Sequence, residues 1–208
     1  MKITISILTI TLSLLTSSQV FANMGAILII PKDPQPVISL QIGGMRSSTD
    51  INRSSVGPAL DNGSFEFTES APFVGGLIGL QNSFYRFSLS YDYTTGSDID
   101  IERFLMNFDF KLGGEEKFRW LLGTGIGVAQ SSYDLDNRSL KQSNGILSFR
   151  GGTEYRLNEK SSLEFIVEYS YELNSSSSKS YYDDNNFTSY TIEDQNSIIM
   201  RVGYSIWF

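Results

Sequence analysis

Apolar and polar residues alternate with a period of two over eight stretches of this chain, and this pattern limits what it can fold into. The last stretch, Ile198 to Phe208, is the clearest. One alternate set is apolar: Ile198, Met200, Val202, Tyr204, Ile206 and Phe208. The other set is mixed: Ile199, Arg201, Gly203, Ser205 and Trp207. Because successive side chains of a β-strand point to opposite faces, each stretch predicts a strand with one apolar and one mixed face.

The seven earlier stretches show the same alternation. They are Val37–Arg46, Phe73–Leu80, Tyr85–Tyr93, Glu102–Leu112, Phe118–Gln130, Gly145–Leu157 and Leu163–Leu173. Short and long connections alternate between them. The short connections are 81–83, 113–117 and 158–161, and the long polar ones are 47–72, 94–101, 131–142 and 174–194. In an up-and-down sheet this puts every short turn at one end, as in transmembrane barrels with short periplasmic turns and long extracellular loops.

Charged residues decide which face meets lipid. The mixed faces carry seven basic residues (Arg86, Arg103, Lys111, Arg119, Arg150, Arg156, Arg201) and six acidic ones (Asp92, Asp109, Glu154, Glu164, Glu168, Glu172). An Arg or Lys facing lipid at the midplane costs about 2–4 kcal/mol. An open sheet edge in lipid would leave backbone groups unsatisfied, so the sheet must close. We therefore expect an all-β, eight-stranded antiparallel up-and-down transmembrane β-barrel, with paired ions in its lumen and apolar side chains outside.

Two residue classes support this orientation. Gly123, Gly125, Gly127 and Gly203 lie on the mixed faces, where they leave room for long charged side chains. Aromatic residues recur towards strand ends, as expected of the girdles at membrane interfaces. They are Tyr91, Tyr93, Trp120, Tyr155, Tyr169, Tyr171, Trp207 and Phe208.

Two segments carry a family resemblance. They are Gly123-Thr-Gly125-Ile-Gly127-Val-Ala129 and the terminal Tyr204-Ser-Ile206-Trp-Phe208. From Val37 to Phe208 the chain resembles the small eight-stranded outer-membrane barrels of Gram-negative bacteria, the group of opacity-type proteins, OmpX and the OmpA barrel domain. The resemblance implies an outer-membrane location among lipids and lipopolysaccharide. It also implies that Tyr204, Ile206 and Phe208 form the terminal signal read by the barrel-assembly machinery.

The N-terminal segment predicts export. Residues 1–22 have the features of a signal peptide: Lys2, an apolar run from Ile3 to Leu15, and Val20-Phe21-Ala22 before the cleavage site. The apolar run is too short to span a bilayer as a helix. We expect residues 23–36 to form an N-terminal periplasmic segment and residues 37–208 to form the barrel. With no cysteine after the cleavage site, a lipoprotein anchor is not expected.

Composition excludes several functions. The chain has no histidine and no cysteine, which removes the commonest general base and the commonest metal ligands. A net charge of −7 argues against nucleic acid. We expect no catalysis, cofactor or metal. A lumenal carboxylate pair such as Glu164 and Glu168 could act as acid and base, but nearby arginines favour structural ion pairing. The alternatives are a soluble lipocalin-like barrel with a small hydrophobic ligand, or a small-solute pore, although aqueous channels typically need 16–18 strands.

The connection 174–194 is the predicted recognition segment. It is rich in serine and asparagine and contains Tyr181, Tyr182, Phe187 and Tyr190. Loops of this composition suit adaptable recognition. We expect a surface protein with a structural or adhesin- or antigen-like role, whose loops contact host molecules, other cells or lipopolysaccharide. The simpler alternative is a hydrophilic cap over the barrel mouth.

Overall fold

The computed structural model describes residues 34–56, 63–113, 116–135, 138–173, 177–183 and 186–208, which form antiparallel strands. The strands are β1 (Gln35–Val56), β2 (Gly63–Gln81), β3 (Tyr85–Thr95), β4 (Ile99–Leu112), β5 (Phe118–Leu135), β6 (Arg138–Asn158), β7 (Ser161–Leu173), β8 (Ser177–Asp183) and β9 (Asn186–Trp207). Within these ranges no helix is long and apolar enough to cross a membrane. The predicted signal peptide, 1–22, and most of the segment 23–36 lie outside the described residues.

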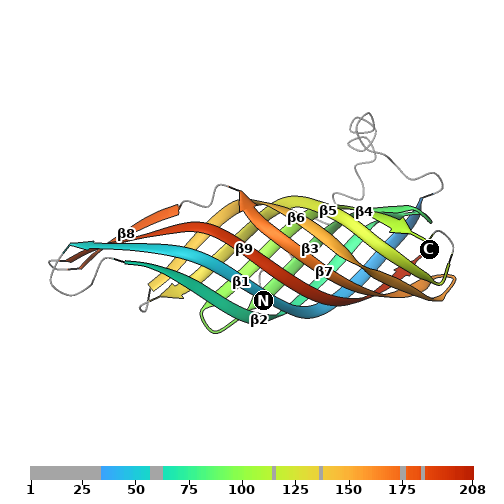
Figure 1. Cartoon of the computed structure of the whole chain (residues 1–208), viewed down its shortest axis with the longest axis horizontal. Helices are drawn as coiled ribbons and strands as arrows, with labels where there is room; N and C mark the ends of the chain where they lie inside the picture. The colour runs from blue at the N-terminus through green and yellow to red at the C-terminus, as the bar shows by residue number, and fades with distance from the viewer. Residues whose placement is uncertain (1–33, 57–62, 114–115, 136–137, 174–176, 184–185) are drawn as a thin grey trace, which may run out of the picture.

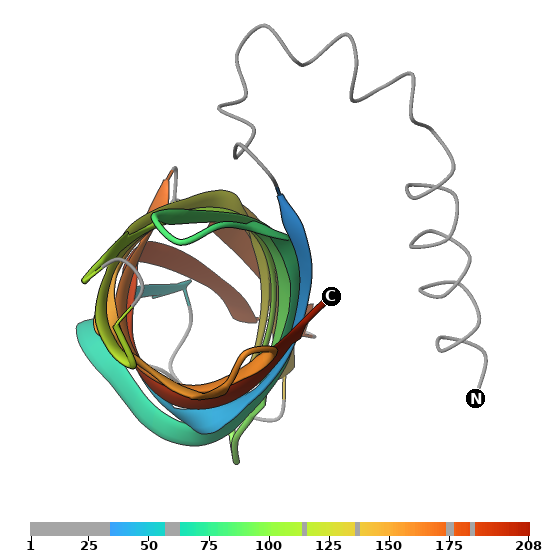
Figure 2. The same cartoon turned by 90° about the vertical axis from the view of Figure 1, so that its right-hand side faces the viewer.

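Eight of the strands close into a ring. Neighbours follow chain order from β1 to β7, β9 pairs with β7, and β9 pairs with β1 to complete the circuit. Figure 2 shows this ring end-on. The remaining strand, β8, pairs only with β9, beyond the end of β7 (Figure 1). The predicted all-β, up-and-down, antiparallel eight-stranded barrel is confirmed, with its short turns after β2, β4 and β6.

The long connections, however, are much shorter than the sequence predicts. β1 continues ten residues beyond Arg46, and only residues 57–62 separate it from β2. Residues 136–137 alone separate β5 from β6, and β8 with the start of β9 occupies most of 174–194. The predicted loops are therefore mainly extended hairpins. Their alternation is hard to follow because serine and threonine are frequent there and because the large apolar residues change to the inward face.

In the part of the barrel nearer the short turns, the two faces point as predicted. On β7, Phe165 and Val167 are 49% and 37% exposed, whereas Glu164 and Glu168 are 2% and 0% exposed. Twelve of the thirteen predicted lumenal charges are buried, and Arg156 is half-buried. We call this zone of outward apolar side chains the apolar belt. A lipocalin-like barrel would need the opposite arrangement, with its apolar side chains inside and its charges outside.

Towards the long-hairpin end, the polarity of the two faces is exchanged. On β4, Ile99 and Ile101 point inwards and are buried, whereas Asp100 and Glu102 are exposed. The inward side chains here form an apolar core: Met45, Ile51, Phe73, Ile99, Ile101, Tyr133, Leu140, Tyr190, Ile192 and Ile199. We call this part the distal extension and its interior the distal core. Because its outside is polar and its inside apolar, the distal extension has the polarity of a protein surrounded by water.

Candidate functional site: the lumen and the distal extension

An ion cluster fills the lumen within the apolar belt, in the half of the belt that lies nearer the distal extension. Arg103 lies 2.5 Å from Asp92 (Nη2 to Oδ2) and 2.9 Å from Glu168 (Nη1 to Oε1). Arg201 Nη2 lies 2.7 Å from the other oxygen of Glu168 and 3.5 Å from Asp92 Oδ2. The cluster joins β3, β4, β7 and β9 across the lumen. Buried charges are tolerated when they are paired and hydrogen-bonded in this way.

A second cluster joins β3, β4, β6 and β7. Asp109 is its centre: Arg86 Nε lies 3.0 Å from Oδ2, and Arg150 Nη2 lies 2.5 Å from the same oxygen. Arg86 Nη1 also lies 2.6 Å from Glu164 Oε1. Glu164 and Glu168 are thus each held by arginines. This favours structural ion pairing over the acid–base alternative for these two carboxylates.

Nearer the short turns, Glu154 pairs with two cations. Arg119 Nη2 lies 2.7 Å from its Oε1, and Lys111 Nζ lies 3.4 Å from its Oε2. Lys111 also donates a 2.6 Å hydrogen bond to Gln81 Oε1. All four side chains are buried. Together, the three groups of cation–anion contacts fill the lumen through most of the belt. We call this part of the lumen the charged section.

Two of the predicted lumenal glycines make room for these polar groups. A Cβ atom at Gly123 would lie 2.1 Å from Asp109 Oδ1, and one at Gly125 would lie 2.5 Å from Asn107 Oδ1. Real Cβ atoms do not approach oxygen this closely. At these two positions glycine makes room for the short side chains of Asp109 and Asn107, not for the long Arg and Glu side chains that the sequence analysis expected.

Apolar layers lie at both ends of the charged section. At the short-turn end, Val37, Leu77 and Trp207 form a small buried cluster, and the Arg156 guanidinium lies 5.8 Å from the Trp207 ring centroid. Trp207 is 2% exposed, so its assignment to an interfacial girdle is wrong. It belongs to the inward set of β9, as its place in the alternation requires. At the other end, Arg201 lies 4.7 Å from the Phe73 ring centroid, where the ions meet the distal core.

The distal core contains a polar network beside its apolar side chains. The Tyr133 hydroxyl donates to Gln195 Oε1, which also accepts a 3.0 Å hydrogen bond from Gln142 Nε2. Burial raises the pKa of Tyr133, so the phenol stays protonated and remains a donor. The ring of Phe67 packs edge-on against Tyr133 at a centroid distance of 6.0 Å. These contacts link β2, β5, β6 and β9 across the barrel.

The four predicted recognition residues do not lie together in a loop. Tyr190 lies in β9, is 1% exposed and belongs to the distal core, so its placement on a surface loop is wrong. The prediction failed because β9 extends further than expected and Tyr190 belongs to the inward set of this strand. The backbone places Tyr181 and Tyr182 in β8 and Phe187 near the start of β9. Their side chains lie outside the part of the chain whose burial is described.

Of the predicted assembly residues, Tyr204 and Ile206 lie on the outside of β9, and Phe208 follows directly after this strand. Tyr204, Ile206 and Phe208 are 43%, 39% and 68% exposed, on the face that carries the apolar belt. The Phe208 N–H donates a 3.1 Å hydrogen bond to the Pro36 carbonyl, which holds the terminal residue against β1. The three side chains therefore form a continuous outward apolar row, and their recognition by the assembly machinery stays a prediction.

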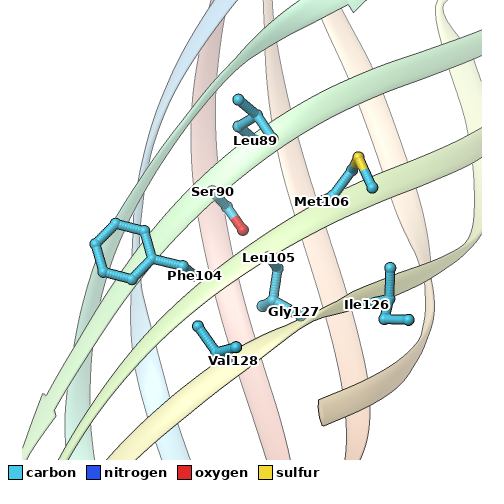
Figure 3. A pocket seen from close by; sticks show the side chains of 8 residues that line it. All are labelled: Leu89, Ser90, Phe104, Leu105, Met106, Ile126, Gly127 and Val128. Carbon is cyan, nitrogen blue, oxygen red and sulfur yellow. The ribbon is translucent and has the colours of Figure 1, made fainter. Parts of the chain in front are cut away.

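A depression lies on the outer wall where β3, β4 and β5 meet (Figure 3). Its rim is apolar and faces outwards, and Ser90, Leu105 and Gly127 lie at its base: the rim residues are Leu89, Phe104, Met106, Ile126 and Val128. The lining is apolar apart from the Ser90 side chain. Among the described residues there is no cluster of three His, Cys, Asp or Glu side chains that could hold a metal ion.

Comparison with solved structures identifies the fold. The chain is similar to Neisserial surface protein A (TM-score 0.54, 15% identity, covering 82% of this chain and 97% of that one). It is also similar to the N-terminal β-barrel domain of OprF from Pseudomonas aeruginosa (TM-score 0.53, 11% identity, covering 80% and 98%). No protein-family model and no curated protein matches the sequence. The chain therefore has the fold of the small outer-membrane β-barrels.

Proposed function

We propose that this chain is an integral outer-membrane protein of a Gram-negative bacterium that acts at the cell surface through its distal extension, in a structural or adhesin- or antigen-like role. The exchange of polarity along the barrel carries this proposal. The apolar belt suits a bilayer, and the distal extension, polar outside and apolar inside, suits water. At about 3.3 Å per residue and a tilt of about 40°, the ten residues of β1 beyond Arg46 rise roughly 25 Å above the belt.

The lumen supports this role over that of a pore. Ion clusters cross it within the belt, and apolar clusters lie at both ends of the charged section. A permeating ion would have to displace paired charges and then pass the distal core. The absence of histidine and the pairing of Glu164 and Glu168 likewise support a non-catalytic role.

Surface labelling tests the proposal, and the natural absence of cysteine makes it simple. Ser54 lies exposed near the distal end of β1, and Glu159 lies exposed in the short turn between β6 and β7. On intact cells, a membrane-impermeant maleimide should label Ser54→Cys and should label Glu159→Cys only after the outer membrane is opened. The opposite pattern would invert the orientation. Recovery of the protein in a soluble fraction without detergent would contradict membrane insertion.

The outward apolar row of Tyr204, Ile206 and Phe208 gives a second prediction, which concerns assembly of the barrel in the membrane. Deleting Phe208 should lower the yield of folded, heat-modifiable barrel in the membrane about tenfold, because its outward aromatic ring completes the row with Tyr204 and Ile206. Tyr182→Ala in β8 is the control and should leave the yield unchanged. The yield is read from boiled and unboiled membrane fractions on a gel. Equal yields for the two variants would remove the special role of the terminus.

Under this proposal, the belt contacts outer-membrane lipids and the inner part of lipopolysaccharide, and the tallest hairpins contact host or cell-surface molecules. The β1–β2 and β8–β9 hairpins are neighbours because β9 pairs with β1 as far as Val56. Figure 1 shows these four strands projecting together beyond the rest of the barrel. Tyr181, Tyr182 and Phe187 lie on this projection, and they remain our candidates for recognition.

A further inference from the structure

The wall of the distal extension is interrupted between β2 and β3. Their ladder ends at the pair Phe73–Thr94, but β2 continues to Gly63 paired with β1 alone. Backbone groups of successive residues in antiparallel strands point alternately to one neighbour and then to the other. Asn82 N–H donates to Tyr85 O across the β2–β3 turn, so the even-numbered residues of β2 direct their backbone groups towards β3.

Pro72 explains where this ladder stops. It is an even-numbered residue of β2, and proline has no N–H to donate to a neighbouring strand. Beyond it, Ser64, Glu66 and Thr68 also direct their N–H and C=O groups to the side away from β1. No strand in the described part of the chain pairs with them there. A strand edge of this kind presents a row of donors and acceptors that can bind another extended chain.

Glu69 closes the lower part of this edge. Its Oε1 accepts a 2.6 Å hydrogen bond from Ser97 N–H, and its Oε2 accepts one of 3.3 Å from Asp98 N–H, in the turn between β3 and β4. A Cβ atom at Gly96 would lie 2.1 Å from Glu69 Oε1, so this turn needs glycine to approach the carboxylate. The open edge is therefore the segment Gly63–Thr68.

The surroundings of the open edge are acidic. From residue 54 to residue 102 the only cation is Arg86, which is buried in the lumen. The same stretch places five carboxylates outside the lumenal ion clusters, on β2, the β3–β4 turn and β4: Glu66, Glu69, Asp98, Asp100 and Glu102. Hydrogen bonds from Ser48 and then from Thr68 lower the pKa of Glu66, which keeps this carboxylate charged. On the neighbouring β1, Arg46 acts on Glu66, and Arg53 pairs in register with Gly63 at the end of the edge.

We propose that the edge Gly63–Thr68 of β2 binds an extended, cationic segment of a partner protein as an additional antiparallel strand. Main-chain hydrogen bonds to Ser64, Glu66 and Thr68 would supply the affinity, as in other cases of strand addition. Lysine or arginine side chains on the outward face of the added strand would lie beside Glu66, which supplies the charge preference. The proposal rests on the proposed function, because the edge must face the cell exterior to meet such a partner.

Two synthetic peptides test the edge with purified barrel in lipid nanodiscs. One alternates threonine and lysine over twelve residues, and the other alternates threonine and glutamate. We expect the lysine peptide to bind, with an affinity that falls as salt is added, and the glutamate peptide to bind at least about tenfold more weakly. Thr68→Pro removes an edge N–H, so it should weaken binding of the lysine peptide about tenfold or more. Thr68→Ala keeps the N–H and should stay within about twofold of wild type.

Further arms separate the possible outcomes. If Thr68→Pro does not give a heat-modifiable barrel, a second test uses the wild-type protein. Two lysine peptides are prepared, one N-methylated at the odd positions and one at the even positions. At least one should bind about tenfold more weakly to the wild-type protein. Equal binding of the two parent peptides, or equal affinities of Thr68→Pro and Thr68→Ala, would overturn the proposal. Concentration-dependent pairing of the barrel alone that Thr68→Pro abolishes would assign the edge to a second copy. These results leave the proposed function intact, because labelling at Ser54 and Glu159 tests it separately.

Discussion

Replacing Glu168 with alanine should lower the free energy of unfolding by about 3–5 kcal/mol, the usual effect of removing one partner from a buried ion pair. Glu168 is fully buried and holds two arginines, Arg103 at 2.9 Å and Arg201 at 2.7 Å. Without it, Asp92 alone would face both guanidinium groups. Urea unfolding in lipid vesicles, followed by tryptophan fluorescence, would measure the change.

An exposed carboxylate provides the matched control for this prediction. Glu102 lies on the outside of β4 in the distal extension, and Glu102→Ala should change the free energy of unfolding by no more than about 0.5 kcal/mol. A double-mutant cycle of Glu168→Ala with Arg201→Ala should show a coupling of about 0.5–3 kcal/mol, because the two side chains share one contact. Equal effects of Glu168→Ala and Glu102→Ala would mean that the lumenal ions do not stabilise the barrel.

The sequence predicted which residues face the lumen because charge fixes the orientation of each strand in lipid. It also contained some of the ion pairs. Arg86 and Asp109 are direct cross-strand partners on β3 and β4, and Arg119 and Glu154 are partners on β5 and β6. The sequence did not set their registers, because it predicted long connections, 94–101 and 131–142, within these two hairpins. The contact of Arg103 with Glu168 joins β4 to β7 across the lumen, and it depends on closure and stagger, which no local pattern encodes.

The distal extension was missed because the apolar alternation changes phase while the strand continues. On β4, Ile99 and Ile101 belong to the inward set, and Phe104 and Met106 belong to the outward set. A phase change within a strand resembles the end of that strand when only hydrophobicity is followed. The signal was nevertheless present, since Ile99 and Ile101 alternate with Asp100 and Glu102. The solvent outside the strand changes there from lipid to water, and the apolar face changes sides with it.

The extent of the apolar belt can be located by placing arginine along the outside of β4. Phe108→Arg, within the belt, should destabilise the barrel by about 2–4 kcal/mol, because the charge would face acyl chains. Glu102→Arg, six residues away on the same face, should change stability by less than about 1 kcal/mol, because that side chain is exposed outside the belt. Urea unfolding in vesicles would measure both. Similar penalties at the two positions would mean that the bilayer also covers the distal extension.

Alanine substitutions on β4 should show the opposite trend: the loss of stability should be larger in the distal extension than in the apolar belt. Ile101 is 2% exposed in the distal core, and Ile101→Ala should cost about 2–5 kcal/mol because it leaves a cavity that neighbouring side chains fill only in part. Phe104→Ala, outward and 49% exposed, should cost less, since acyl chains can occupy the space that the ring vacates. If Phe104→Ala were the more damaging change, β4 would have the same polarity along its whole length. In that case a water-exposed distal extension would have to be given up.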